Sequence, residues 1–369
     1  MKPYIPERVV IESAVQNSEI TRNVLARVPD VPVEIIDSAE TMLHEAQRLT
    51  PSITLAKKTL ILAEFKGKYF KPCPGRQSRA ETRNVCCDYY VINFASNCHM
   101  ECTYCYLQSY LNFPYMIVYA DIARLITELD EALSANREVQ FRIGTGELAD
   151  SLALDPLTRY SVPLVEFFAR QPNGILELKT KSNCVENLLD LDHQGRTVVA
   201  WSVNPEYIQQ KEELKTSTIE QRLEAARRCV EAGYPVAFHF DPMVHYEGWE
   251  EGYRTLIKRI FDRIPPHAIA WISLGALRMQ PGQLEIMKER FPNSILPLGE
   301  LVPAEDGKLR YFKPIRTELY SSLRTWIEES GSGVKVYACM ERPEVWRKAF
   351  GSSPESDEAL GRYLVELAP

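Results

Sequence analysis

Short apolar runs alternate with helix-patterned segments through the middle of the 369-residue chain. Runs of valine, isoleucine and aromatic residues are typical of buried strands, and we expect six, at residues 89–95, 139–144, 174–180, 196–203, 234–241 and 267–275. Helical spacing predicts intervening helices at residues 118–135, 157–170, 218–232 and 247–263, with a compressed crossover around residues 185–189. Such alternation predicts parallel strands joined by right-handed crossovers.

The fold class predicted from this pattern is α/β, with a partial (β/α)6 barrel of the TIM type. Six units fall short of the eight that close such a barrel, so we expect an open side that admits a bulky substrate. A linker rich in Pro, Gly and Arg near residue 75 separates a small N-terminal α/β appendage. The expected division is therefore 1–75 for the appendage, 76–280 for the barrel and 281–369 for a C-terminal extension that covers the opening.

The flanking segments carry weaker patterns. In the appendage we expect strands at residues 8–12, 33–37 and 58–65 and a helix at 18–27. In the extension we expect a helix from residue 282, a hairpin at 308–313, a helix at 317–329 and a strand at 334–338.

The composition indicates the kind of protein and its cellular compartment but no specific function. A hydrophobic share of 45% supports a full core, and the net charge of −7 argues against nonspecific polyanion binding, although it leaves room for a local basic groove. The chain shows neither a long apolar run nor an N-terminal leader, so we expect a cytoplasmic protein with no membrane partner. Nine cysteines without a secretory signal indicate reduced thiols and metal binding.

Three of these cysteines, Cys98, Cys102 and Cys105, follow the first predicted barrel strand at C-x3-C-x2-C spacing. Cysteines hold electron-carrying 4Fe–4S clusters in sets of four. A set of three leaves one iron open for a substrate or cosubstrate, so the spacing favours such a cluster. Zinc, with His99 as a possible fourth ligand, and purely structural thiols are the alternatives.

This pattern, with Tyr104 before the last cysteine, resembles the signature of radical S-adenosylmethionine (SAM) enzymes. The resemblance implies that the amino and carboxylate groups of SAM bind the open iron. An electron from the reduced cluster, supplied by a donor of the flavodoxin or ferredoxin type, then breaks a carbon–sulfur bond and yields a 5′-deoxyadenosyl radical.

Polar residues at the ends of the next strands are candidates for holding SAM. A glycine allows close backbone approach, a carboxylate can accept an ammonium group, and a lysine can pair with a carboxylate. Each type also occurs in ordinary turns or solvated strand ends. The candidates are Gly146 and Glu147, then Lys181 in preference to Lys179, and then Ser202 and Asn204, which share one face of their strand.

Four further segments resemble the spore photoproduct lyase family: residues 105–108, 180–181, 201–204 and 231–235. In that family the adenosyl radical takes hydrogen from a methylene-bridged thymine dimer in DNA, which fragments to two thymines while SAM is regenerated. The resemblance carries over the three cysteines as cluster ligands, Lys181 and Ser202 as SAM contacts, and Tyr104 and Tyr106 as a hydrogen-atom relay. Packing beside the cluster is the alternative role for Tyr106.

The chain departs from this family at one point. The lyases carry a hydrogen-donating cysteine shortly after the second strand, where this chain has Glu147. Cys184 and Cys339 are candidate replacements, and Cys339 is our choice of catalytic residue; buried structural roles are the alternative. A different nucleotide, peptide or metabolite substrate is the competing function, and a non-catalytic metal- or nucleic-acid-binding protein is the third.

Residues near the predicted C-terminal hairpin are candidates for contacting DNA, although such clusters more often form a solvated amphipathic edge. Basic side chains there are candidates for phosphate contacts and aromatic ones for stacking or wedging between bases. The residues are Arg310, Tyr311, Phe312, Lys313 and Arg316.

Overall fold

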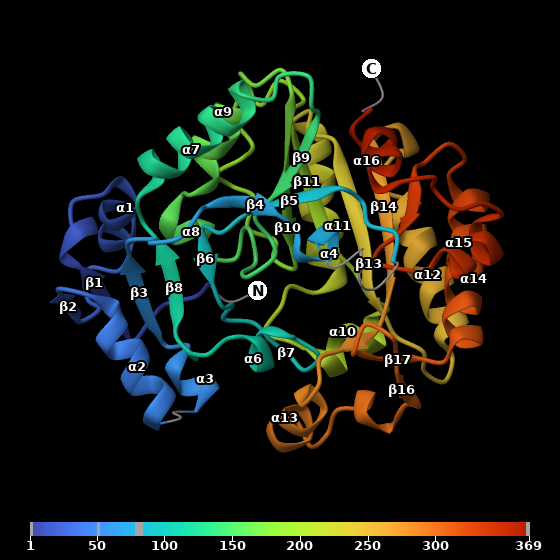
Figure 1. Cartoon of the computed structure of the whole chain (residues 1–369), viewed down its shortest axis with the longest axis horizontal. Helices are drawn as coiled ribbons and strands as arrows, with labels where there is room; N and C mark the ends of the chain where they lie inside the picture. Colours follow the sequence, from blue (N-terminus) through green and yellow to red (C-terminus); the bar gives the residue numbers. More distant parts are fainter. Residues whose placement is uncertain (1–2, 50–51, 78–83, 367–369) are drawn as a thin grey trace.

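A curved sheet of eight strands forms the centre of the computed structural model, which describes residues 3–49, 52–77 and 84–366 (Figure 1). The strand order is β18-β14-β13-β11-β10-β9-β5-β4, and neighbours pair in parallel except for β4 with β5. The bounds are β4 Phe70–Pro72, β5 Tyr89–Ile92, β9 Phe141–Gly144, β10 Gly174–Thr180, β11 Thr197–Ser202, β13 Val236–Met243, β14 Ile269–Ala276 and β18 Val336–Ala338.

The partial TIM-type barrel and its six predicted strands are confirmed. The sheet also contains a seventh parallel strand, β18, and the antiparallel edge strand β4, so the count of six units was too low. β18 was expected as a strand of the extension, and its pairing with β14 makes it part of the barrel sheet.

The expected helices form between the strands, with corrections. They are α7 Ile122–Ser134, the pair α8 Asp155–Thr158 and α9 Ser161–Phe168 in place of one helix, α11 Ile219–Glu231 and α12 Trp249–Phe261. A further short helix, α10 Glu206–Glu212, was not expected. α7 begins four residues later than expected, because residues 116–119 form a strand instead. Residues 181–196 contain turns and no helix, as the compressed crossover predicted. α11 starts at a capping box of Thr218 and Gln221.

A second sheet, ordered β2-β1-β3-β8-β6, lies beside the barrel (Figure 1). Its elements are β1 Arg8–Glu12, β2 Val33–Ile36, β3 Thr59–Ala63, β6 Ala95–Ser96 and β8 Met116–Tyr119, with α1 Glu19–Arg27, α2 Ala39–Leu49 and α3 Ile53–Ala56, and the 3-10 turn η1 Ser13–Val15. Two of these strands come from beyond the boundary expected at residue 75, whereas β4 from before it joins the barrel. The division into three domains stays a prediction.

The C-terminal part adds a three-stranded sheet, β15-β17-β16, and helices against the outer strands of the barrel. Its elements are η2 Pro266–Ala268, β15 Arg278–Met279, α13 Gln283–Arg290, η3 Leu296–Leu298, β16 Leu301–Pro303, β17 Leu309–Tyr311, α14 Lys313–Ser330, α15 Pro343–Phe350 and α16 Asp357–Val365. No helix within the described ranges is both long and apolar enough to cross a membrane.

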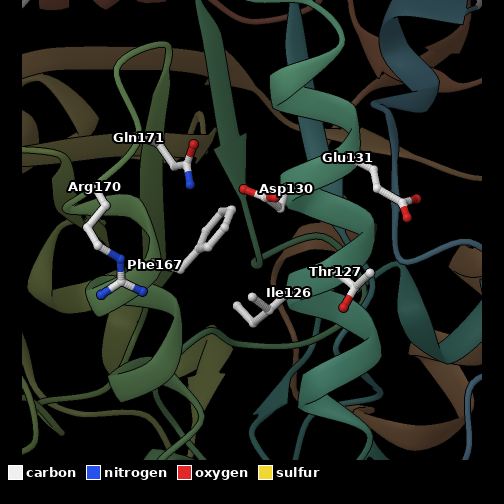
Figure 2. Close-up of a pocket in the computed structure, with 7 residues that line it drawn as sticks. All are labelled: Ile126, Thr127, Asp130, Glu131, Phe167, Arg170 and Gln171. Atoms are coloured by element: carbon white, nitrogen blue, oxygen red, sulfur yellow. The ribbon is translucent and has the colours of Figure 1, made fainter.

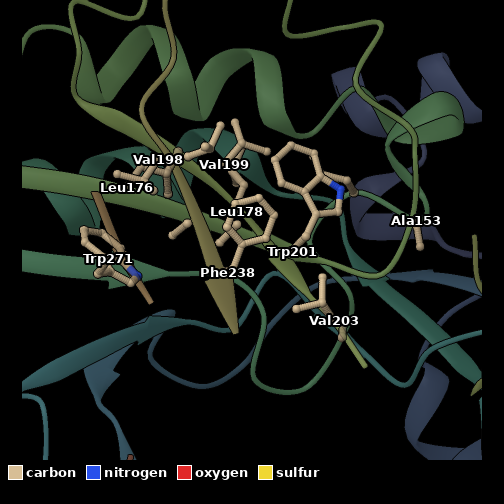
Figure 3. Close-up of a cluster of buried hydrophobic side chains, with 14 of the residues drawn as sticks. Ala153, Leu176, Leu178, Val198, Val199, Trp201, Val203, Phe238 and Trp271 are labelled. Atoms are coloured by element: carbon tan, nitrogen blue, oxygen red, sulfur yellow. The ribbon is translucent and has the colours of Figure 1, made fainter. Parts of the chain in front are cut away.

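The two faces of the barrel sheet differ in chemistry. Apolar side chains such as Leu178, Trp201 and Phe238 are fully or almost fully buried (Figure 3), and burying each contributes roughly 1.5–3 kcal/mol. A polar group fills the inside of the sheet instead. There Glu177 Oε1 lies 2.6 Å from His239 Nε2 and accepts a 3.2 Å hydrogen bond from Trp271 Nε1. These buried polar side chains are therefore paired with one another.

Candidate active site

The loop with the three cysteines is fixed at its start by an asparagine. Asn97 has a φ of 75°, which asparagine tolerates better than most residues. Its side-chain oxygen accepts a 2.8 Å hydrogen bond from the backbone amide of Cys98, and its side-chain nitrogen donates to the carbonyl of Pro114 at 2.8 Å. The Cys105 amide donates to the Cys102 carbonyl at 3.1 Å. The loop is therefore held by its own backbone groups.

A short antiparallel ladder holds the middle of this loop. β7 (Glu101–Cys102) pairs with β12 (Glu213–Leu214), which brings Glu213 opposite Cys102. Glu101, directly before Cys102, is buried. Its carboxylate forms an ion pair with Arg290 at 2.7 Å, and the Lys57 ammonium group lies 3.6 Å away. Since Lys57 precedes the barrel and Arg290 follows it, distant parts of the chain meet at the cysteine loop.

All nine cysteines of the chain are free thiols in the structure. Burial raises the pKa of Cys98 to about 12 and that of Cys102 well above its usual range, and Cys105 raises both further. The three thiols therefore lie near one another. Across the described residues, no three His, Cys, Asp or Glu side chains already form a metal-binding group. The donor set suits iron–sulfur chemistry, and loading requires the thiols to turn toward a common point and lose their protons.

His99, the alternative zinc ligand, is turned to the N-terminal segment. Its ring stacks on Tyr4 with centroids 4.9 Å apart. Burial lowers the pKa of His99 to about 4, so the ring is neutral at physiological pH. Neither ring nitrogen has a hydrogen-bond partner among the described residues.

Tyr104 leads into a buried charged network that the sequence did not reveal. Its hydroxyl group donates to Glu213, which also pairs with Arg222 at 2.5 Å. Glu213 accepts a 3.0 Å hydrogen bond from the Asn204 amide, whose oxygen accepts from Tyr253 at 3.1 Å. Both polar atoms of Asn204 are thus engaged by protein groups. These hydrogen bonds help to hold Glu213 in place, and direct contact of Asn204 with SAM stays a prediction.

Tyr106 and Glu147 meet on the other side of the loop. The Tyr106 hydroxyl group donates to the Glu147 carbonyl at 2.7 Å. Burial raises the pKa of the Glu147 carboxyl group, while Lys71 and Lys179 lower it. Its Oε2 is buried without a hydrogen-bond partner among the described residues. A buried carboxylate oxygen without a partner, on a side chain that is partly exposed, suits a cationic ligand.

Gly146 is required by the close approach of two strand ends. A Cβ atom at this position would lie 3.0 Å from the Lys179 Cβ and 3.2 Å from its carbonyl oxygen. Asp150 fastens the same loop to β10, accepting hydrogen bonds from the Thr180 hydroxyl at 2.6 Å and the Lys181 amide at 2.8 Å. Asp150 was not among the predicted site residues, because its partners lie 30 and 31 residues away in the sequence.

Lys181 lies at the cysteine loop, as predicted. Its Nζ is 5.7 Å from the centre of the Tyr104 ring. Its charge opposes the burial that raises the pKa of Cys102, and it helps to lower that of Glu213. Ser202 is buried at the end of β11, where its carbonyl oxygen accepts a 2.8 Å hydrogen bond from Arg222. These two strand ends and Glu147 surround the loop.

The two candidate donor cysteines lie in different surroundings. The Cys339 thiol lies 3.9 Å from the Arg278 Nη2, which pairs with Asp241 at 3.1 Å. Cys184 lies in the loop after β10, where its amide donates to Ser182. Burial raises the pKa of Cys184 to about 11, and the nearby charges that affect it are acidic.

Three of the five candidates for DNA contact are buried, which contradicts both a phosphate-binding patch and a solvated edge at these positions. Arg310 is buried and pairs with Asp306 at 2.5 Å. Arg316 is buried and pairs with Glu341 at 3.0 Å. Tyr311 is buried as well; only Phe312 and Lys313 are exposed.

A surface hollow of about 450 Å³ lies between α7 and α9 (Figure 2). Its lining includes Ile126, Asp130, Phe167 and Arg170, and none of the predicted site residues. It belongs to the outer helix layer and has no part in the cysteine site.

The partial barrel and the three-cysteine loop define the class of protein: a radical SAM enzyme. The family model described as spore photoproduct lyase matches residues 4–314, so the chain belongs to the spore photoproduct lyase family, whose members are DNA-repair lyases. The predicted family and enzyme class are confirmed.

Curated relatives and solved structures agree with this assignment. The chain is 28% identical to spore photoproduct lyase from Bacillus subtilis (strain 168) and 27% identical to that from Geobacillus sp. (strain Y412MC61); in both cases the match covers 81% of this chain and 86% of the relative. A spore photoproduct lyase complexed with dinucleoside spore photoproduct matches with a TM-score of 0.79, 24% identity and coverage of 91% of this chain and 100% of the other. A variant with bound AdoMet and the same dinucleoside also has a TM-score of 0.79, with 24% identity and coverage of 91% and 99%.

Proposed function

We propose that this protein repairs the spore photoproduct in DNA by radical SAM chemistry, with a 4Fe–4S cluster on Cys98, Cys102 and Cys105. The main support is the meeting of three free thiols, Lys181 and Glu147 at the carboxyl ends of the barrel strands. When bound, the cluster would supply the electron that cleaves SAM. A reducing donor of the flavodoxin or ferredoxin type and a cytoplasmic location, where thiols stay reduced, complete the proposal.

Different residues around the loop bind different parts of SAM. The free oxygen of Glu147 receives the ammonium group, and Gly146 allows its strand end to approach β10. Lys181 pairs with the SAM carboxylate, and Ser202 contacts the ribose or methionine part. Asn204 holds Glu213 in place and is a further candidate SAM contact.

The hydroxyl groups of Tyr104 and Tyr106 lie on opposite sides of the cysteine loop. That of Tyr104 donates to Glu213, and that of Tyr106 donates to the Glu147 carbonyl. We assign them to hydrogen-atom transfer between the substrate side and SAM. Cys339, near Arg278, is the donor candidate for the product radical.

A different nucleotide, peptide or metabolite substrate is the second candidate. The observation in its favour is the absence of cysteine from residues 145–150, where the lyases carry their donor. The buried state of Arg310 and Arg316 adds to it, since two expected phosphate contacts are lost.

The test is anaerobic reconstitution followed by incubation with SAM, reductant and dinucleoside spore photoproduct. Release of thymine supports the lyase. Formation of 5′-deoxyadenosine without thymine points to the second candidate. A protein that binds no iron, or forms no 5′-deoxyadenosine, contradicts both. Cys102→Ala is the negative variant, and Cys229→Ala, in the buried face of α11, is the matched control.

A further inference from the structure

Three basic side chains surround one buried carboxylate in the middle of the cysteine loop. The carboxylate is that of Glu101, which directly precedes Cys102. It lies 2.7 Å from Arg290, 3.6 Å from Lys57 and 3.8 Å from Lys215. We call these four residues the Glu101 charge group. One carboxylate neutralises one of three positive charges, so the group carries a positive surplus beside a predicted iron ligand.

Three separate parts of the chain supply the basic side chains. Lys57 follows α3, Lys215 follows β12, and Arg290 is the last residue of α13. Figure 1 shows α3, β7 and α13 in the lower part of the view. Arg290 is also fixed through its Nη1, which donates to the Gln108 side-chain oxygen at 2.7 Å. The arrangement therefore depends on the tertiary fold and not on one local segment.

Lys57 brings its charge into contact with the loop itself. Its Nζ donates to the Met100 carbonyl at 3.1 Å, and Met100 stands between Cys98 and Cys102. The Lys57 side chain is only 9% exposed, so salt and water screen its charge weakly. Burial raises the pKa of Cys98, and the charge of Lys57 opposes this effect. A buried cation is thus held against the segment that joins two predicted ligands.

A purely structural ion pair needs only one of these cations. Arg290 meets the Glu101 carboxylate at 2.7 Å and satisfies its charge alone. Within the described part of the chain, neither Lys57 nor Lys215 forms an ion pair with any other carboxylate. Keeping two further charges at this position costs desolvation and is not needed to hold Glu101. The surplus therefore suits an additional negative charge at the loop.

We infer that the Glu101 charge group stabilises the reduced state of the 4Fe–4S cluster and so sets its reduction potential. This inference rests on the proposed function. Three thiolates outweigh the positive charge of the core, so the loaded site is anionic. The electron from the reducing donor adds one more negative charge, and no bond forms or breaks in this step. Because net charge and exposure set the potential of such a cluster, a positive surplus beside the ligands raises it. The four residues act through charge and bind no iron.

The experiment is a redox titration of the reconstituted protein without SAM, followed by electron paramagnetic resonance of the reduced cluster. Lys57→Met keeps most of the side-chain length and removes the charge. It should shift the reduction equilibrium about tenfold towards the oxidised form, which lowers the potential by about 59 mV for one electron. Glu101→Gln removes a negative charge and should raise the potential by a similar amount. Lys58→Met is the matched control, because Lys58 pairs with the exposed Glu7, and it should keep the wild-type potential.

The opposite signs separate an effect of charge from a loosened loop, which would shift both variants in the same direction. Shifts of equal sign, or wild-type potentials in both variants, would overturn the inference.

Lys215→Met tests the same charge effect without changing a buried side chain, since Lys215 is 57% exposed. Its potential should be lower than that of the wild type in dilute buffer and equal to it at about 1 M salt, where charges are screened within ~3 Å. No shift in dilute buffer would contradict the inference even if the buried variants fail to hold iron. A wild-type protein that holds no cluster contradicts the proposed function instead, so the two failures appear in different samples.

Discussion

Replacing Glu213 by glutamine should destabilise the protein and loosen the cysteine loop. The side chain is fully buried and is the shared acceptor for Arg222, Tyr104 and Asn204. Glutamine keeps the shape but leaves the Arg222 charge without its partner. Breaking a buried ion pair on one side costs roughly 3–5 kcal/mol.

The pKa of Glu213 gives a second route to this magnitude. Although burial raises it, Arg222 and Lys181 together with hydrogen bonds lower it from 4.5 to about 2, which corresponds to roughly 3 kcal/mol. A lowered folded-state pKa stabilises the protein above the unfolded value, and the benefit is lost as pH falls through the folded value. The difference in the free energy of unfolding between wild type and E213Q should therefore be largest above pH 4.5 and should decrease towards pH 2.

The assay is urea unfolding of the metal-free protein under anaerobic conditions. Glu224→Gln is the matched control, because Glu224 also pairs with an arginine, Arg227, at 2.7 Å, but on the exposed face of α11. An exposed pair is worth at most about 1 kcal/mol. If E213Q is no less stable than E224Q at pH 7, the reasoning about the buried network is refuted.

Three further outcomes are expected. Glu147→Gln should weaken SAM binding by about tenfold or more, because a hydrogen bond to a charged group is worth ~1.5–3 kcal/mol; unchanged affinity in calorimetry refutes the clamp role. Gly146→Ala should cost about 1–3 kcal/mol in unfolding, because its Cβ has no room beside Lys179; equal stability would contradict the close approach. Arg316→Met should cost roughly 3–5 kcal/mol by unpairing a buried carboxylate, whereas Lys313→Met should stay within about 0.5 kcal/mol; similar urea midpoints for both would show that Arg316 is not held as described.

The barrel was predictable because most of its strands are rich in buried apolar residues and alternate with helical patterns. The elements that were missed are short or ambiguous. β4 has three residues and contains Pro72, and β8 joins directly to the helical pattern of α7. A local pattern cannot tell which sheet a short strand enters. The N-terminal sheet therefore gained β6 and β8 only in three dimensions.

The site shows the same division between local and distant information. The three cysteines and Lys181 could be proposed from the sequence because each follows a recognisable strand. Glu213 gave no signal, since its partner Tyr104 lies 109 residues away in the sequence. For Arg310 and Arg316 the local pattern was misleading. Their basic pattern suggested an exposed patch, but each is buried against an acidic partner.

The N-terminal sheet has a structural role in the cysteine loop. The chain leaves β5, pairs β6 with β8 through Ala95↔Val118 and Ser96↔Ile117, and carries the three cysteines between these strands. Lys57 adds a hydrogen bond to the Met100 carbonyl at 3.1 Å. On the opposite side β12 pairs with β7. Two independent supports therefore hold both ends and the middle of the loop that carries the three cysteines. A loop held only at one end would be free to move its thiols apart, so these supports keep the three cysteines near one another.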